Sequence, residues 1–351
     1  MKTRVLVVDD STFMQRLISR LINEDDTLQV VGTAKNGLEA IDLVLKLRPD
    51  VVTLDIEMPV MNGLEALKKI MRERPTPIIM LSSLTQDGAT ETIEALQSGA
   101  VDFIPKPSGS ISADLYKVKE ELIAKIKLAA QATPHAIYKT FPRVGPNFKQ
   151  SIENRPPNNQ LKQIVAIGTS TGGPKALDIV ISALPSDFPY PVLVVQHMPP
   201  KFTHSLAQRL DRSSRVKVVE ATDNERLEGG TVYIAPGDYH MTVAQKANEL
   251  RIALHQQAPR NGHRPSVDTL FESITKLTSL SRHYVLMTGM GSDGAKAMLE
   301  AKHQGAYSTI AESQETCVVY GMPRSAIEIN CVDFIIPLYK IASKIVEVTG
   351  Q

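Results

Sequence analysis

The sequence has 351 residues, more than a single domain usually holds, so we expect two domains. Its 39 basic and 38 acidic side chains leave a formal net charge of +1. This balance gives no electrostatic footprint for nucleic acid or for a membrane surface, so partners must be sought in specific sites.

Cysteine usage and the start of the chain bear on the cellular compartment. The two cysteines, Cys317 and Cys331, are too few for a disulfide framework or a zinc cage and fit a reducing cytosol. The apolar run at residues 5–8 is short and ends in two carboxylates, so it predicts a strand and not a signal peptide. No apolar stretch reaches transmembrane length. We therefore expect a cytoplasmic protein without membrane insertion.

In the first 128 residues, short β-branched runs alternate with amphipathic helical patterns such as 37–47 and 63–71. The expected strands are residues 5–8, 30–32, 51–54, 78–81 and 103–104. Five βα units of this kind predict a five-stranded, doubly wound parallel sheet. In such a sheet, ligands bind beyond the carboxyl ends of the strands.

Polar residues stand at those expected strand ends. Asp9 and Asp10 follow the first strand, Asp55 the third, Ser82 the fourth and Lys106 the fifth. Three carboxylates at one edge repel one another unless a cation lies among them, and Mg²⁺ is the natural oxygen-liganded choice. With a lysine and a hydroxyl as anion donors, the set predicts a site where an aspartate accepts a phosphoryl group.

A plainer interpretation makes Asp9 and Asp10 the N-cap residues of the helix that follows them. It explains neither the Met-Pro and Asn-Gly pairs that follow Asp55 nor the prolines on both sides of Lys106. The phosphoryl-acceptor interpretation accounts for all of these features.

These motifs resemble those of response-regulator receiver domains, which have a flavodoxin-like fold. The resemblance rests on Val-Val-Asp-Asp-Ser at 7–11, Leu-Asp-Ile-Glu-Met-Pro-Val-Met-Asn-Gly at 54–63, Ser82 and Lys106-Pro, and it covers residues 1–128. It implies phosphorylation by a histidine kinase. The roles that it implies are phosphoacceptor for Asp55, Mg²⁺ ligands for Asp10, Asp55 and the backbone carbonyl of Glu57 with Asp9 assisting, and phosphoryl-site support for Ser82, Lys106 and the switch aromatic Phe103.

Residues 129–161 are expected to form a linker. Apolar periodicity disappears between 133 and 160, where proline and asparagine recur. A second domain is then expected over residues 162–351.

That second domain begins with a strand-like run, a glycine-rich turn and a helical pattern over residues 163–184. The turn contains Gly-Thr-Ser-Thr-Gly around Ser170, which matches the nucleophile elbow of serine hydrolases. A Walker phosphate loop needs lysine directly after the final glycine, where Pro174 stands, and the spacing of a dinucleotide fingerprint is missing. A catalytic serine and a plain connecting turn remain open from this stretch alone.

Two further strand-like runs end near polar residues. Residues 191–197 end at His197, and residues 284–289 lead into a turn that contains Asp293. If these strands are parallel neighbours of the first, Ser170, His197 and Asp293 lie at one edge of one sheet. A serine needs a base to take its proton, and the base needs a carboxylate to orient it.

Each residue of this set also has a plainer interpretation. His197 alone could be a satisfied polar residue, and Asp293 could cap the next helix. Three other histidines compete: His283 precedes its expected strand, His240 lies at the edge of an expected hairpin of residues 231–235 and 241–243, and His263 lies in a polar loop that could contact substrate.

Residues 162–348 resemble the catalytic domain of the chemotaxis protein-glutamate methylesterases, the CheB family. The motifs are Ile-Gly-Thr-Ser-Thr-Gly-Gly-Pro, Val-Val-Gln-His-Met-Pro, Tyr-Ile-Ala-Pro-Gly-Asp, Arg-Pro-Ser-Val-Asp and Thr-Gly-Met-Gly-Ser-Asp-Gly. The resemblance implies a doubly wound, mostly parallel α/β domain with Ser170, His197 and Asp293 as catalytic triad. It also implies oxyanion donors from the backbone of Thr171 and Met290. Thr169 departs from the pattern, where alanine is frequent, and adds a hydroxyl that competes for hydrogen bonds.

The resemblance implies hydrolysis of glutamate γ-methyl esters on methylated chemoreceptors, and deamidation of specific glutamines, without a cofactor for the ester chemistry. It further implies that the unphosphorylated receiver covers the esterase site. An alternative is a phospho-switched binding protein without hydrolase activity, which would leave the elbow idle. A DNA-binding output is disfavoured by the neutral charge and by the lack of a short basic helix-turn-helix unit.

Overall fold

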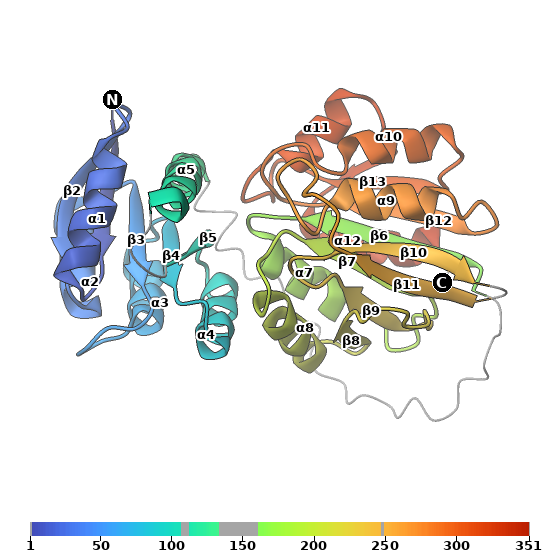
Figure 1. The fold of residues 1–351 in the computed structure, drawn as a ribbon, viewed down its shortest axis with the longest axis horizontal. Helices are drawn as coiled ribbons and strands as arrows, with labels where there is room; N and C mark the ends of the chain where they lie inside the picture. Colours follow the sequence, from blue (N-terminus) through green and yellow to red (C-terminus); the bar gives the residue numbers. More distant parts are fainter. Residues whose placement is uncertain (1, 107–111, 133–160, 247–248, 351) are drawn as a thin grey trace. The chain divides into compact units, whose positions relative to one another are not determined.

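A computed structural model describes residues 2–106, 112–132, 161–246 and 249–350 (Figure 1). The chain divides into two compact units, Met1–Lys139 and Thr140–Gln351. Residues 133–160, which make up most of the expected linker, lie outside the described residues. The domain boundaries at 128, 129, 161 and 162 therefore stay predictions.

Unit 1 is built on a five-stranded parallel sheet of order β2-β1-β3-β4-β5. Its strands are β1 (Thr3–Val8), β2 (Leu28–Ala34), β3 (Val51–Asp55), β4 (Ile78–Ser82) and β5 (Asp102–Pro105). Its helices are α1 (Thr12–Asn23), α2 (Gly37–Leu47), α3 (Gly63–Glu73), α4 (Gln86–Gln97) and α5 (Ser112–Ala129). Helix α1 packs against α5, while α2 packs against α3 and α3 against α4. The doubly wound sheet expected from the sequence is confirmed.

Local caps begin the helices of unit 1. The side chains of Ser11, Asn36, Asn62 and Thr85 each accept a backbone N–H from the first turn of the helix that follows. The N-cap of α1 is therefore Ser11. Asp9 instead accepts the N–H of Ser11 at 3.0 Å, so the plain capping role considered for the aspartate pair does not hold.

Unit 2 contains a seven-stranded parallel sheet of order β14-β13-β12-β6-β7-β9-β8. Its strands are β6 (Gln163–Thr169), β7 (Val192–Gln196), β8 (Lys217–Glu220), β9 (Thr231–Ile234), β12 (Ser281–Leu286), β13 (Ser308–Glu312) and β14 (Phe334–Ile336). Its helices are α7 (Gly173–Ser182), α8 (Phe202–Ser213), α9 (Val267–Thr275), α10 (Ala295–His303), α11 (Met322–Glu328) and α12 (Leu338–Val348). The predicted α/β class is confirmed for this unit too.

The hairpin expected from residues 231–235 and 241–243 is wrong. Strand β9 lies inside the large sheet, between β7 and β8, and all four of its residues are buried. A fully buried run of this kind suits a parallel strand covered on both faces. The hairpin is instead formed by β10 (His240–Lys246) and β11 (Glu249–His255), whose antiparallel pair makes a separate sheet.

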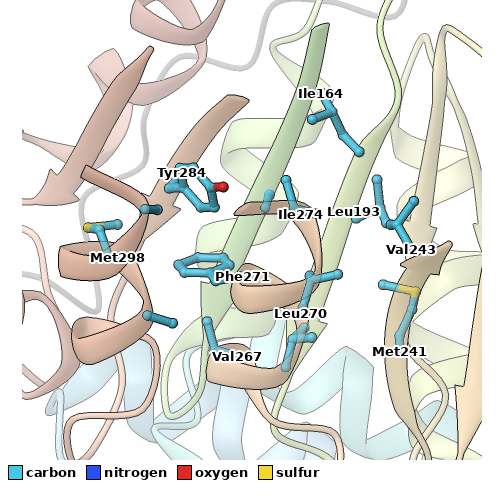
Figure 2. Close-up of a cluster of buried hydrophobic side chains, with 14 of the residues drawn as sticks. Ile164, Leu193, Met241, Val243, Val267, Leu270, Phe271, Ile274, Tyr284 and Met298 are labelled. Carbon is cyan, nitrogen blue, oxygen red and sulfur yellow. The ribbon is translucent and has the colours of Figure 1, made fainter. Parts of the chain in front are cut away.

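The core of unit 2 holds the amino end of α9 in place. Figure 2 shows Val267, Leu270 and Phe271 of α9 packed among side chains of the large sheet and of β10. The rings of Phe271 and Tyr284 meet edge to face, with centroids 5.0 Å apart. Packing of this density leaves little freedom to the first turn of α9.

Among the helices that the structure describes, none has the length and apolar character needed to cross a membrane.

His283 lies within a strand rather than before one, which corrects the prediction from the sequence. Strand β12 begins at Ser281, and the His283 ring is fully buried. Its Nδ1 lies 2.9 Å from Oγ of Ser308 and its Nε2 lies 2.9 Å from Oε1 of Gln163. Burial lowers the pKa of His283 to about 4, so the ring is neutral at physiological pH.

Acid is expected to destabilise unit 2 through this ring. An unfolded histidine binds a proton near pH 6.5, whereas folded His283 resists until about 4. The contribution of neutral His283 to the free energy of unfolding is complete above pH 6.5. Up to about 3 kcal/mol of it is lost as pH falls toward 4. Unfolding free energies measured from pH 7.5 to 4 should therefore fall less in His283→Asn than in the wild type. The exposed His303→Asn is the control, and equal slopes in all three proteins would contradict the assignment.

Candidate active site

The carboxylates expected at the edge of the first sheet lie together. Asp9, Asp10 and Asp55 each offer an oxygen atom, and these atoms lie within 4.8 Å of one another. Asp9 and Asp55 are buried, and the ammonium group of Lys106 lies 3.2 Å and 2.6 Å from their carboxylates. One lysine does not balance three carboxylates. The oxygen donors and the excess negative charge fit a hard divalent cation such as Mg²⁺.

The charges of this cluster perturb one another. Burial raises the pKa of Asp55 to about 6, with Lys106 opposing and with the charges of Asp9 and Asp10 adding to the rise. Burial alone would lower the pKa of Lys106, but its hydrogen bond and ion pairs with Asp55 and Asp9 raise it above the ordinary value. An added positive charge at this site would therefore stabilise the ionised form of Asp55.

Of the other residues expected around Asp55, Ser82 ends β4 at the same edge, whereas Phe103 lies inside β5. The hydroxyl of Ser82 accepts a hydrogen bond from Thr92 at 2.6 Å and lies 3.2 Å from the carbonyl oxygen of Gly88, both in α4. The Phe103 side chain is buried. Glu57 is exposed just beyond β3, and Ser83 donates to its carboxylate at 3.4 Å.

In unit 2, residues 163–182 form the strand, turn and helix that the elbow requires. Strand β6 ends at Thr169, Ser170 lies in the turn, and Gly172 at φ +79° is the N-cap of α7. The backbone N–H of Ser170 donates to the carbonyl oxygen of Thr288 at 3.0 Å. A methyl group at Gly173 would lie 2.0 Å from Oε1 of Gln196, so a larger residue there would displace the Gln196 side chain, whose Nε2 donates to the carbonyl oxygen of Ser170 at 3.0 Å. The turn is held from both neighbouring strand ends.

His197 lies beside Ser170. Strands β6 and β7 are parallel neighbours with Thr169 opposite Gln196, so the next residue of each, Ser170 and His197, leaves the sheet at the same edge. Nε2 of His197 lies 2.8 Å from Oδ2 of Asp293. Its Nδ1 is buried and has no hydrogen-bond partner among the described residues. The imidazole is therefore oriented by Asp293 and keeps one nitrogen available.

Asp293 is held by the amino end of α9. Apart from His197, its carboxylate accepts hydrogen bonds from Nδ2 of Asn261, Oγ of Ser266 and the backbone N–H groups of Val267 and Asp268, at 2.7–3.2 Å. Burial favours the neutral acid, but His197 and the backbone donors outweigh it and hold the pKa of Asp293 below its ordinary value. Asp293 thus caps α9, whereas the N-cap of the helix that follows it, α10, is Gly294.

Asp268 completes a reciprocal arrangement that the sequence did not predict. Its Oδ1 accepts the backbone N–H groups of Gly294 and Ala297, at 3.0 and 3.2 Å, in the first turn of α10. Asp293 therefore binds the amino end of α9, the helix that carries Asp268. Asp268 in turn binds the amino end of α10, the helix that follows Asp293. Burial, and then the charge of Asp293, raise the pKa of Asp268. The Arg-Pro-Ser-Val-Asp motif was its only signal in the sequence.

The residues expected to border the site lie next to Ser170. Thr171 follows it in the turn and is buried, while Met290 is 44% exposed. Gly289, which precedes Met290, packs so closely that a methyl group there would lie 2.8 Å from Cβ of Ser170. The Thr169 hydroxyl donates to the carbonyl oxygen of Thr288 at 2.9 Å, so this departure from the family pattern is satisfied within the sheet.

The remaining histidines have different surroundings. The ring of His263 stacks on that of His197, with centroids 3.7 Å apart and planes 9° apart. His240 accepts the N–H of Ser266 at 3.3 Å, so it supports the loop that holds Asp293. His283 lies at the opposite end of its strand from the site. Of the three, only His263 contacts the His197 ring.

These features define a two-domain α/β protein. A cluster of three carboxylates lies at the edge of one parallel sheet, and a serine, an imidazole and a carboxylate lie at the edge of a second one.

Comparison with known proteins agrees with this class. The family model described as CheB methylesterase matches residues 165–345 of this chain. A second family model, described as response regulator receiver domain, matches residues 5–114. A protein-glutamate methylesterase/protein-glutamine glutaminase of Geobacillus kaustophilus is 51% identical over 355 residues, with all of both chains covered. The protein of the same name from Thermotoga maritima is 46% identical to this chain, with 98% of each chain covered. The chain belongs to the CheB methylesterase family.

A solved structure agrees for unit 2. The crystal structure of the Thermotoga maritima CheB methylesterase catalytic domain matches with a TM-score of 0.52 at 45% identity. The match covers 53% of this chain and 98% of that one.

Proposed function

We propose that this protein is a protein-glutamate methylesterase and protein-glutamine glutaminase whose receiver domain regulates it by phosphorylation. The observation that carries the proposal is the imidazole of His197, which binds Asp293 through Nε2 at 2.8 Å and has no partner for Nδ1 among the described residues, at the sheet edge where Ser170 also lies. A histidine held in this way is poised to accept a proton from a neighbouring hydroxyl.

In the proposed acylation step, Ser170 attacks the γ-carbonyl carbon of a methylated glutamate. His197 takes the hydroxyl proton on Nδ1, and Asp293 stabilises the imidazolium that forms. The backbone N–H groups of Thr171 and Met290 are proposed to bind the oxyanion of the tetrahedral intermediate. His197 then returns the proton to the leaving methoxide, which departs as methanol.

Deacylation reverses these roles with water as the nucleophile. His197 takes a proton from water, the hydroxide attacks the acyl ester of Ser170, and the serine leaves with the proton. The products are a free glutamate and the restored enzyme. A glutamine side chain can follow the same route with ammonia as the leaving group, which explains how one site serves both activities.

In the receiver, Asp55 is proposed to accept a phosphoryl group from a chemotaxis histidine kinase. Asp10, Asp55 and the backbone carbonyl of Glu57, with Asp9 assisting, would hold Mg²⁺, which neutralises negative charge when bound. Lys106 supplies a second positive charge. Ser82 and Phe103 are proposed to respond to the phosphoryl group. In this response the hydroxyl of Ser82 would exchange its hydrogen bonds to α4 for a hydrogen bond to phosphate.

The substrates are proposed to be methylated chemoreceptors.

The regulatory part is tested by Asp55→Asn. We expect a small phosphodonor with Mg²⁺ to raise methanol release from methylated receptor by the wild type at least several-fold. The variant lacks the phosphoacceptor, so its rate should not change. Omitting Mg²⁺ should abolish the activation of the wild type, because three carboxylates then repel an incoming phosphoryl anion. Activation of the variant to the wild-type level would exclude Asp55 as the acceptor.

A further inference from the structure

Glu312 is a buried carboxylate that the proposed chemistry does not use. It ends strand β13 and has no exposed surface. Its Oε2 accepts the backbone N–H of Thr288 at 2.8 Å, while Oε1 has no hydrogen-bond partner within the described part of the chain. A buried carboxylate with one bare oxygen destabilises a fold and calls for an explanation.

Thr288 connects Glu312 to the elbow. Its carbonyl oxygen accepts the N–H of Ser170 at 3.0 Å and the hydroxyl of Thr169 at 2.9 Å. Its own hydroxyl donates to the carbonyl oxygen of Thr171 at 3.0 Å. Thr288 therefore contacts all three consecutive residues of the turn that presents the proposed nucleophile. A shift of Thr288 would move Ser170, and small errors in the position of a nucleophile slow a reaction strongly.

We propose that Glu312 is a positioning residue for the esterase, which in its carboxylate form fixes Thr288 and, through Thr288, the backbone that carries Ser170. The inference rests on Ser170 being the nucleophile, as proposed above. A charged acceptor binds a backbone N–H more strongly than a neutral one does. Loss of the charge therefore loosens Thr288 without releasing it.

The charge of Glu312 changes in the neutral range. Burial raises the pKa of Glu312 to about 7, against the opposing effects of the Thr288 N–H, Thr316 and Cys317. Cys317 is the titratable group that faces this carboxyl, and burial followed by the charge of Glu312 raises its pKa, so it stays a neutral thiol. Charged groups of the helices packed against β13 pair elsewhere, as Lys302 with Asp333, Arg324 with Glu328 and Lys344 with Glu347.

The test is the pH dependence of methanol release from methylated receptor by wild type and Glu312→Gln. Glutamine keeps the shape, still accepts from Thr288 and is neutral at every pH. Effects of pH that the two enzymes share cancel when the wild-type kcat is divided by that of Glu312→Gln. We expect the kcat of the wild type to be about equal to that of Glu312→Gln at pH 5.5 and about three- to tenfold higher at pH 8.5, with KM unchanged.

Asp333→Asn is the matched control. Like Glu312, Asp333 accepts a backbone N–H, but its donor is Thr309 of β13 at 2.9 Å, at the end of that strand remote from Ser170. Its ratio to wild type should not depend on pH. A wild-type to Glu312→Gln ratio that is constant across pH would overturn the positioning role.

Thermal unfolding tests the buried charge without substrate. The folded pKa of Glu312 lies above the unfolded value, so its stabilising contribution is complete below pH 4.5 and is lost as pH rises through 7. The Tm of Glu312→Gln should therefore gain on that of wild type across this window, and a constant difference would contradict the titration. Methanol release that does not need Ser170 would refute the proposed function instead, whatever the Tm values show.

Discussion

Replacing Ser170 by alanine is expected to reduce kcat for methanol release by about three orders of magnitude or more. The variant keeps the turn, because the contacts that hold the turn at Ser170 use its backbone N–H and carbonyl oxygen rather than its hydroxyl. The oxyanion donors and the substrate surface also remain, which accounts for a small residual rate. The measurement is steady-state methanol release from methylated receptor, together with KM.

Ser182→Ala is the matched control for that change. Ser182 ends α7, the helix that follows the elbow, and its hydroxyl lies 3.4 Å from the carbonyl oxygen of Ile179. This variant should retain wild-type activity. If Ser170→Ala instead kept more than a tenth of the wild-type kcat, Ser170 would not be the nucleophile, and the binding-protein interpretation would gain ground.

Replacing Asp293 by asparagine is expected to lower kcat by about four orders of magnitude. The hydroxyl of Ser266 and the N–H of Asp268 both donate to Oδ1, so they would keep the amide oxygen in that place. The amide NH₂ would then replace Oδ2, which faces Nε2 of His197 and the N–H of Val267. That nitrogen would then have to accept, so the proton of the ring would move to Nδ1. The base would lose the nitrogen with which it takes the serine proton.

Folding must be separated from chemistry in this variant, since Asp293 also caps α9. Thermal unfolding of Asp293→Asn measures the loss of the acceptor for the buried N–H of Val267, which we expect to cost about 1–3 kcal/mol. A loss of that size leaves most molecules folded and cannot explain a large fall in kcat. A fall of less than tenfold in the folded variant would show that orientation of His197 does not depend on the carboxylate.

Features with a local cause could be predicted from the sequence. The elbow was predictable because its strand, glycines and Pro174 are contiguous, and each glycine has its own steric reason, as Gly172 does with its positive φ. The receiver edge was predictable because each polar residue directly follows a buried apolar run. Parallel strands then bring these ends together without any detail of packing.

Features that depend on distant partners could not be predicted. The run at residues 231–234 pairs in parallel with two earlier strands, β7 and β8, so the run that follows it at 241–243 was the wrong choice of hairpin partner. Two of the donors to Asp293 are backbone N–H groups, which any sequence could supply. Glu312 was missed because its link to Ser170 passes through Thr288 in another strand. The stacking of His263 on His197 follows from a loop with no periodic pattern.

We propose that Ser170, His197 and Asp293 form one proton-transfer chain in which Nδ1 of His197 is the base. The most direct measurement is the ¹⁵N NMR spectrum of histidine-labelled protein, with His197 assigned by comparison with His197→Gln and recorded with the ring in its neutral form. We predict a proton on Nε2, facing Asp293, and an unprotonated Nδ1. We also predict that Asp293→Asn reverses this tautomer. A wild-type ring with its proton on Nδ1 would contradict this proton-transfer chain.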